Sequence, residues 1–185
     1  MYDKMNDTSL KHLTPASLTI LRFLSDDPIR DFYQREIARA TKVSVGATNQ
    51  ILRTLAEKEI VTREKKGKMF FYKYNIRNPV ARQLKILFNI NDLDDLIKKI
   101  RDQCKRIILF GSCAEGSDVK DSDVDLFILT NEKDSVKKAI NRHEKRINKK
   151  ISAILVNANE FVRLRSRDKP LHERIMKGIV LWQTE

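Results

Sequence analysis

The stretch RIILFGSCAEGSDVKDSDVDLFILT, residues 106–130, decides the fold of the second half of this chain. It begins with an apolar run at 106–110 that is typical of a short buried strand. Gly111 and Ser112 follow at once. After nine intervening residues come the segment SDVD at 122–125 and a second apolar run at 126–129. This order predicts two strands joined by a loop that carries glycine, serine and two aspartates.

The residue types in this stretch suit the binding of a nucleotide and a metal ion. Gly111 lets the backbone approach a phosphate, and Ser112 adds a hydroxyl donor where free N–H groups open the next helix. Asp123 and Asp125 lie two apart on a predicted strand, so they project from one face. Paired carboxylates beside a phosphate cradle hold Mg²⁺, or Mn²⁺, against a triphosphate. We therefore expect Asp123 and Asp125 to be the catalytic and metal-binding residues. The alternative is an acidic surface loop, which leaves the glycine-serine placement unexplained.

This arrangement resembles the DNA-polymerase-β-like nucleotidyltransferase superfamily, and more narrowly the minimal nucleotidyltransferase proteins, over about residues 92–185. The residues that match the family pattern at its usual spacing are Gly111, Ser112, Ala114, Gly116, Ser122, Asp123, Asp125 and Leu126. The resemblance implies that Gly111, Ser112 and Ser122 bind the nucleotide. It also implies transfer of a nucleoside monophosphate, with ATP as the expected NTP substrate, to a hydroxyl group. In this group the acceptor is often a protein, such as the partner toxin of a toxin–antitoxin pair.

Two positions depart from the family pattern. Glu115 stands where the family often has arginine, which removes a phosphate contact. The strand predicted at 151–156, ISAILV, holds no acid, whereas active members carry a third carboxylate there that helps to bind metal and activate the acceptor. Glu160, the nearest acid downstream, is expected to begin a helix. The alternative function is therefore a regulator whose degenerate nucleotidyltransferase domain senses nucleotide or mediates dimerisation.

The sequence before Pro79 predicts helices followed by a hairpin. The first helix is expected from Thr14-Pro15 to the segment DDP at 26–28, the second over about 33–40, and the third, capped by Ser44, over about 45–58. Two β-rich runs, about 60–64 and 69–76, flank a lysine-rich turn in which Gly67 offers the positive φ that a tight hairpin needs.

This order of elements resembles the winged-helix transcription-regulator superfamily over about residues 13–78. The resemblance places the third helix in the major groove of double-stranded DNA. The residues expected to reach base edges are Asn49, Gln50 and Arg53, and those expected to contact phosphate are Arg35, Lys42, Lys65, Lys66 and Lys68. Thirteen Lys and Arg against seven Asp and Glu in this stretch favour a polyanionic partner. The alternative is a module for protein contacts whose lysines form a solvated turn.

The bulk composition bounds the remaining possibilities. The 185 residues carry a net charge of +12 and 41% hydrophobic residues, which suits two small folded domains. We expect an α+β or α/β two-domain chain: a winged helix-turn-helix at 13–78, a linker helix at 79–91 and a small mixed-sheet nucleotidyltransferase fold with flanking helices at 92–185. Within 79–103 the pattern predicts two linking helices.

The remaining expectations concern location and assembly. No apolar run is long enough to span a membrane, and residues 1–12 lack the apolar core of a secretory signal. The two cysteines, Cys104 and Cys113, are expected to stay reduced in a cytoplasmic protein. A homodimer is expected, because winged-helix regulators usually read two half-sites. The acceptor and the operator sequence are left open.

Overall fold

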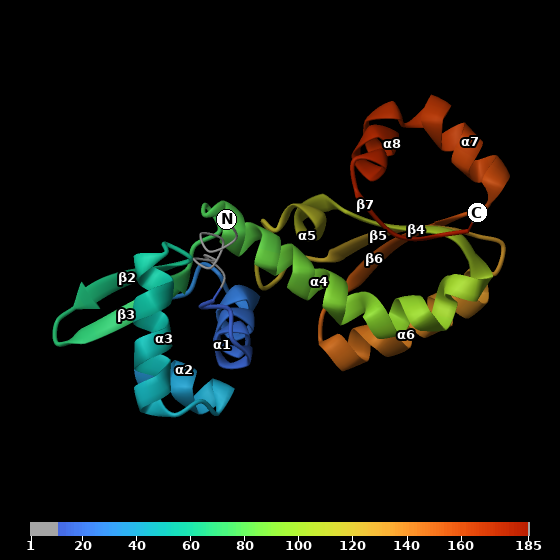
Figure 1. Ribbon diagram of the computed structural model, residues 1–185. Helices are drawn as coiled ribbons and strands as arrows, with labels where there is room; N and C mark the ends of the chain where they lie inside the picture. Colours follow the sequence, from blue (N-terminus) through green and yellow to red (C-terminus); the bar gives the residue numbers. More distant parts are fainter. Residues whose placement is uncertain (1–10, 185) are drawn as a thin grey trace, which may run out of the picture. The chain divides into compact units, whose positions relative to one another are not determined.

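The computed structural model describes residues 11–184, and the chain divides after Arg82 into two compact units (Figure 1). The division falls within the helix that runs from Pro79 to Ile100. Residues 1–10, which include most of the segment expected to carry no secretory signal, lie outside the described residues.

The first unit combines three helices with a small antiparallel sheet. Its elements are α1 (Pro15–Asp26), β1 (Phe32–Tyr33), α2 (Gln34–Thr41), α3 (Val45–Glu57), β2 (Val61–Lys66) and β3 (Met69–Tyr74). The strands are ordered β1-β3-β2, and both pairings are antiparallel. The predicted helices and hairpin are present. The two-residue strand β1 was not predicted, because a run of two residues has no detectable periodicity.

Local signals fix the ends of these elements as the sequence predicts. Thr14 accepts a hydrogen bond from the Ser17 amide at 3.2 Å, with proline at the first helical position. Ser44 accepts from the Ala47 amide at 3.3 Å and begins α3. Gly67 has φ +61° at the hairpin turn. These three signals act within a few residues, and for this reason the sequence alone reveals them.

The second unit is built on a four-stranded mixed sheet. Its elements are α4 (Pro79–Ile100), a 3-10 turn (Arg101–Gln103), β4 (Cys104–Phe110), α5 (Gly111–Glu115), β5 (Val124–Thr130), α6 (Lys133–Ile147), β6 (Ile151–Val156), α7 (Ala158–Arg167), α8 (Lys169–Met176) and β7 (Ile179–Gln183). The strand order is β6-β5-β4-β7. Only β5 and β6 are parallel, so the predicted mixed sheet with flanking helices is confirmed.

The prediction of two linking helices at 79–103 is wrong. One helix of 22 residues, α4, runs from Pro79 to Ile100 and is followed by a single 3-10 turn. No proline or glycine occurs after Pro79 in this helix, so nothing in the sequence breaks it.

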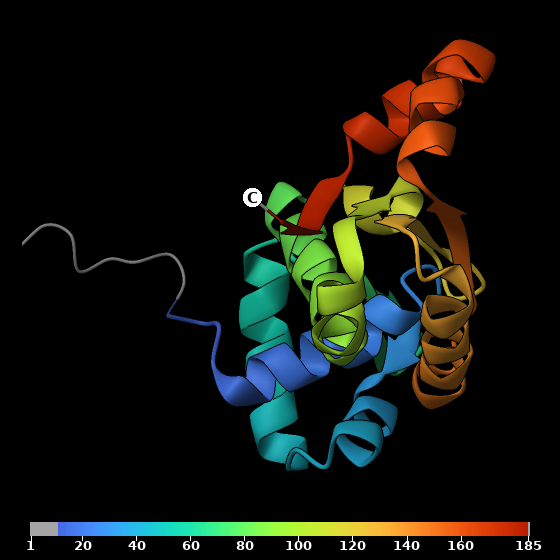
Figure 2. The same ribbon diagram turned by 90° about the vertical axis from the view of Figure 1, so that its right-hand side faces the viewer.

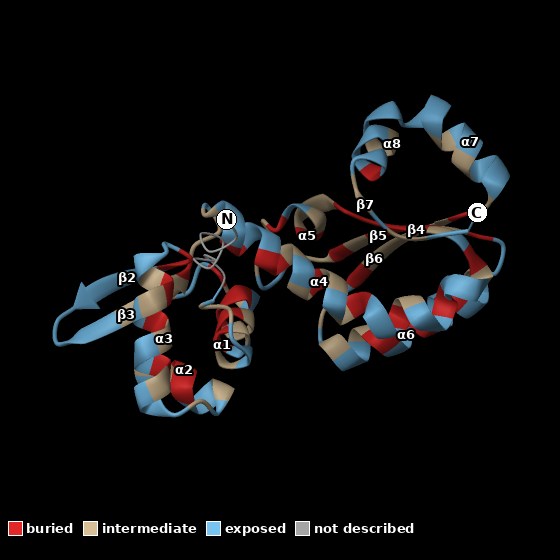
Figure 3. Ribbon diagram, viewed as in Figure 1, coloured by how far each residue is buried: buried red, intermediate tan, exposed pale blue. Residues whose placement is uncertain are grey.

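Side chains alternate along β4 and β5 and form a core on each face of the sheet. On one face Ile107 and Leu109 pack with Leu93, Leu96 and Ile100 of α4 and with buried residues of α6. On the other face Ile108, Phe110 and Phe127 pack with α7 and α8. Figures 1 and 2 show α4 and α6 on the opposite side of the sheet from α7 and α8. The sheet is therefore buried on both faces, and the buried faces of α4 and α6 are red in Figure 3.

Two further findings concern the described residues. None of their helices is long and apolar enough to cross a membrane. Cys104 and Cys113 are both free thiols, and both are buried.

Candidate active site

The end of β4 requires glycine at position 111. Gly111 has φ +68°, a backbone conformation that disfavours any side chain. A Cβ built there would lie 2.3 Å from Oδ2 of Asp125, because Phe110 and Asp125 face each other across the antiparallel β4–β5 pair. The glycine therefore allows the chain to turn directly beside a carboxylate.

The two aspartates of the motif differ in environment. Asp125 lies within β5, whereas Asp123 precedes the strand, and both are partly buried. Burial raises the pKa of the Asp125 carboxyl, the positive charge of Arg174 lowers it, and the neighbouring Asp123 raises it further. Asp123 accepts a hydrogen bond from Nζ of Lys150 at 2.9 Å.

An open pocket of about 380 Å³ adjoins the motif. Its lining residues are Gly111, Ser112, Ala114, Glu115, Asp125, Arg174, Lys177 and Gly178. It combines the glycine-serine turn and one carboxylate of the motif with two cations from the C-terminal part of the chain. Three predicted site residues thus line one pocket.

The other two predicted motif residues, Ser122 and Asp123, are not among the lining residues. The Ser122 hydroxyl accepts a hydrogen bond from the Val119 amide at 2.9 Å. In this arrangement Ser122 shapes the loop, and its place in nucleotide binding stays a prediction.

Sequence reasoning missed Arg174 and Lys177. Their signal is weak, because they occur in a chain rich in lysine and arginine and lie about 50 positions from Asp125. They reach the motif because β7 pairs with β4 and because Gly178, directly before β7, packs tightly on the Leu109 carbonyl. A Cβ at Gly178 would lie 2.5 Å from that oxygen.

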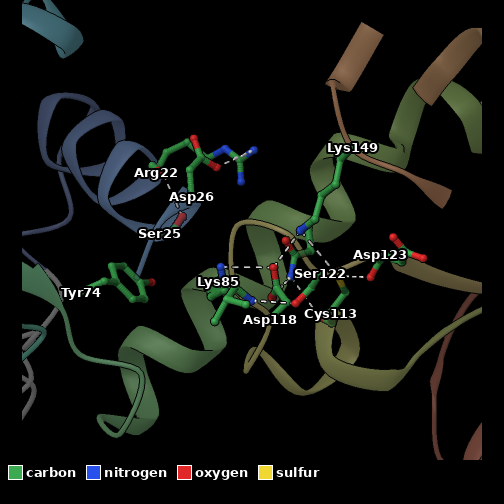
Figure 4. Close-up of polar contacts among 12 residues, drawn as sticks. Arg22, Ser25, Asp26, Tyr74, Lys85, Cys113, Asp118, Ser122, Asp123 and Lys149 are labelled. Atoms are coloured by element: carbon green, nitrogen blue, oxygen red, sulfur yellow. Dashed lines mark hydrogen bonds and ion pairs between the residues drawn. The ribbon is translucent and has the colours of Figure 1, made fainter. Parts of the chain in front are cut away.

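The loop between α5 and β5, which carries Ser122 and Asp123, is fixed on its inner side by a buried carboxylate, Asp118. Its side chain is 1% exposed and forms ion pairs with Nζ of Lys149 at 2.8 Å and Nζ of Lys85 at 3.3 Å (Figure 4). Asn89 donates to Asp118 at 2.8 Å and to the Cys113 carbonyl at 3.0 Å. The loop that leads to Asp123 is therefore tied to α4 and to the segment before β6.

Two pKa shifts follow from this cluster. Burial alone would raise the pKa of Asp118, but the hydrogen bond from Lys149 and the positive charge of Lys85 outweigh it, and the pKa is lowered. Burial raises the pKa of the nearby Cys113 thiol to about 11, so this cysteine is protonated at neutral pH and is a poor nucleophile.

On the strand beside Asp125, the residue in register with it is a serine rather than an acid. The predicted strand is present as β6, Ile151–Val156, and its register places Ser152 beside Asp125. Glu160 does not substitute, because it belongs to the capping box at the start of α7 and pairs with Lys133. Among the described residues no group of three or more His, Cys, Asp or Glu side chains is placed to hold a metal ion.

The donor set nevertheless fits one hard divalent cation. Mg²⁺ is usually held by one or two carboxylates together with substrate phosphates and water, rather than by a complete cage of protein ligands. Asp123 and Asp125 supply two carboxylates, and a triphosphate in the adjoining pocket would supply the remaining oxygens.

In the first unit, the residues predicted to read base edges are exposed on α3. Asn49, Gln50 and Arg53 all face solvent, opposite the buried Thr48 and Leu52. A shallow hollow of about 540 Å³ lies where α2 meets α3, and its cations are Arg35, Arg39 and Lys42. Arg39 was not among the predicted contacts.

The hairpin β2–β3 carries the remaining predicted phosphate contacts. Figure 3 shows most of this hairpin exposed, and Lys65 and Lys68 are exposed at its tip. Lys66 differs from them, because its ammonium group pairs with Asp31 and Glu64. Its charge is partly neutralised within the unit.

Comparison with known proteins identifies the class of the second unit. Residues 91–185, just over half of the chain, match the family described as Polymerase beta, Nucleotidyltransferase, and the chain belongs to this family. The predicted membership of the DNA-polymerase-β-like nucleotidyltransferase superfamily is thereby confirmed for the second unit.

Two solved structures are similar to part of this chain. One, titled a possible transcriptional regulator from Methanosarcina mazei Go1, is 21% identical and covers 54% of this chain and 88% of its own, with a TM-score of 0.36. The other, titled the toxin-antitoxin MntA-HpeT mutant, is 20% identical and covers 52% of this chain and 74% of its own, with a TM-score of 0.38. No curated protein matches the chain in sequence.

Proposed function

We propose that this chain is a DNA-binding protein whose nucleotidyltransferase domain binds an NTP, expected to be ATP, with Mg²⁺ or Mn²⁺ and transfers its NMP to a hydroxyl acceptor. The observation that carries the proposal is the pocket in which Gly111, Ser112 and Asp125 of the motif face Arg174 and Lys177 of the C-terminal segment. Carboxylates for a metal and cations for phosphate, brought together beside a glycine turn, are the groups that nucleotidyl transfer needs.

In the proposed reaction the acceptor hydroxyl oxygen bonds to the α-phosphorus of the NTP. The bond from that phosphorus to the bridging oxygen breaks, pyrophosphate leaves, and the hydroxyl proton passes to water. A divalent cation would bind Asp123 and Asp125 and withdraw charge from the phosphate oxygens. Arg174 and Lys177 would bind the negative charge of the triphosphate, and the glycine turn would let it approach the backbone.

The acceptor would approach from the side of α7 and α8. A second hollow of about 560 Å³ there is lined by Arg165, Lys169, His172, Glu173, Met176 and Lys177. Lys177 belongs to both hollows, so an acceptor bound in the second would lie next to the nucleotide. A protein acceptor, such as a toxin partner, is the kind that the family resemblance implies.

For the first unit we propose a winged helix-turn-helix that binds double-stranded DNA as a homodimer. The element order α1-β1-α2-α3-β2-β3, the polar face of α3 and the basic hollow at the α2–α3 turn support it. Arg53→Ala is expected to weaken sequence-specific binding by about 1–3 kcal/mol in a gel-shift titration, since base contacts carry discrimination of this size. Equal loss of affinity for specific and nonspecific DNA would contradict a base-reading role for Arg53.

A second candidate function is supported by one observation, the serine at the third carboxylate position. Without that acid, the domain would bind nucleotide without efficient transfer, and the protein would act as a nucleotide-sensing or dimeric transcriptional regulator.

The deciding experiment is transfer of label from α-³²P-ATP, with Mg²⁺ or Mn²⁺, to proteins and RNA of a lysate that includes the products of neighbouring genes. The purified full chain is compared with the variant Asp123→Asn/Asp125→Asn. Label on a protein band that the variant fails to produce supports the transferase. Label on an RNA band identifies another acceptor class. Nucleotide and metal binding without label on any band favours the sensing regulator.

A further inference from the structure

Asp123 of the motif pairs with a lysine, the residue just before β6. Nζ of Lys150 lies 2.9 Å from Oδ2 of Asp123. The backbone keeps this lysine there, because the amide of Val124 donates to the Lys150 carbonyl at 2.9 Å where β5 and β6 begin to pair. Lys150 is thus held beside Asp123 by the start of the parallel strand pair.

The adjacent residue Lys149 has a different task. Lys149 points inward to the buried Asp118 (Figure 4). Lys150, by contrast, is 73% exposed and pairs with Asp123. Two consecutive lysines therefore reach the two sides of one loop. The first anchors the loop, and the second pairs with a carboxylate of the motif on the exposed side of that loop.

The charges at the motif balance one divalent cation. Asp123 and Asp125 contribute two negative charges, and the place beside Asp125 on β6 holds the neutral Ser152. Arg174 and Lys177 already bring positive charge to the same pocket. A second divalent cation within about 4 Å of the first, as in two-metal sites, would be repelled by the first. Glu115 also lines the pocket, but among the described residues no three acidic side chains come together to hold a metal ion.

We propose that this site uses one divalent cation and that Lys150 supplies the second positive charge, acting as a positioning residue that holds Asp123. The inference rests on the proposed nucleotidyl transfer. A lysine is suited to supplying positive charge beside Asp123, because its ammonium group remains charged at neutral pH. The ammonium group would supply, beside Asp123, positive charge that a second metal ion would otherwise bring to the site.

The first test counts metal ions. The full chain is titrated with Mn²⁺ in the presence of α,β-methylene-ATP, and bound Mn²⁺ is followed by electron paramagnetic resonance. One Mn²⁺ per chain is expected for the wild type, and a further weakly bound Mn²⁺ is expected in Lys150→Met, where the charge of Asp123 is released. Two Mn²⁺ in the wild type, or none, would overturn the inference.

The second test separates a charge effect from a structural one. Lys150→Met is expected to lower kcat for label transfer by about tenfold or more while the KM for ATP changes by less than about twofold, and Lys150→Arg should restore most of the rate. Lys145→Met, an exposed lysine on α6, is the matched control and should match the wild type. Transfer by Lys150→Met at the wild-type rate or faster would mean that the lysine only competes with metal, which contradicts the proposal.

The two tests also distinguish failure of the inference from failure of the proposed function. A wild-type chain that binds one Mn²⁺ with nucleotide but transfers no label contradicts the transferase and leaves the one-metal site intact. A chain that transfers label while binding two Mn²⁺ supports the transferase and overturns the role of Lys150. Thermal unfolding of each variant verifies that the exposed substitution has not changed the fold.

Discussion

The motif segment, residues 111–125, and the tip of the β2–β3 hairpin, residues 65–68, both carry charged residues and a glycine with positive φ. Their surroundings differ. In the motif segment Asp118 is buried among two lysines and an asparagine, and Gly111 touches Asp125. At the hairpin tip nothing lies within 4 Å of a Cβ added to Gly67, and the flanking lysines are exposed.

The difference reflects what each segment is proposed to bind. A metal ion and a triphosphate need carboxylates and donors held in fixed geometry, which only packed and ion-paired side chains provide. DNA phosphates are bound through solvated charges whose contributions are small and separate. Substitutions in the loop should therefore have large effects that depend on each other, whereas substitutions at the hairpin tip should have small, additive ones.

The largest expected effect comes from removing both motif carboxylates. Asp123→Asn/Asp125→Asn should abolish Mg²⁺-dependent ATP binding in a calorimetric titration and lower transfer by at least about 100-fold, because no hard ligands remain for the cation. DNA binding should be unchanged. Asp121→Asn, an exposed acid of the same loop, is the control. Loss of DNA binding in the double variant would mean that these carboxylates are structural.

The next effect concerns stability rather than chemistry. Asp118→Asn removes the buried partner of Lys85 and Lys149 and should lower the free energy of unfolding by about 3 kcal/mol at pH 7, measured by urea denaturation. Because the pKa of Asp118 is lowered in the folded state, its contribution is present above the ordinary value of 3.8 and disappears as the pH falls through the folded pKa. The difference in the free energy of unfolding between wild type and variant should therefore narrow below pH 3.8. A gap that stays constant there would contradict the ion-pair explanation.

Alanine substitutions at Gly111 and Gly46 distinguish a glycine that the backbone and its surroundings require from one that only adds flexibility to a helix. Gly111→Ala should destabilise the fold by about 2 kcal/mol and weaken nucleotide binding, since it combines a positive φ with a Cβ against Asp125. Gly46→Ala within α3 meets nothing within 4 Å and should stabilise by about 0.5–1 kcal/mol. Thermal unfolding that shifts in the same direction for both variants would show that contact with Asp125 is not decisive.

The smallest effects are expected at the hairpin tip. Lys65→Ala/Lys68→Ala should weaken binding to any DNA and reduce the slope of log K against log salt by about 1 for each phosphate contact that is lost. Lys66→Ala should change DNA affinity less, because Asp31 already pairs with this lysine. DNA affinity is measured by fluorescence anisotropy. A larger effect for Lys66 than for the other two would contradict the assignment of the main phosphate contacts to Lys65 and Lys68.

Sequence signals were informative wherever the cause acts over a few residues. Thr14, Ser44 and Gly67 fix helix starts and a turn through contacts within three positions, and the strand at 151–156 was placed correctly by its apolar run. Over residues 79–103 the sequence predicts two helices, whereas the structure has the single helix α4, in which no residue stops a helix.

The sequence by itself determined the family of the second unit and two carboxylates of the site, since a glycine at a strand end and aspartates two apart are local patterns. Only the tertiary structure decided which cations surround them. Arg174, Lys177 and Lys150 reach the motif through the β4–β7 and β5–β6 pairings, and Asp118 finds Lys85 and Lys149 across about 30 residues in each direction. In a chain with 37 lysines and arginines, local sequence does not distinguish these few from the solvated remainder, because their environment depends on strand order.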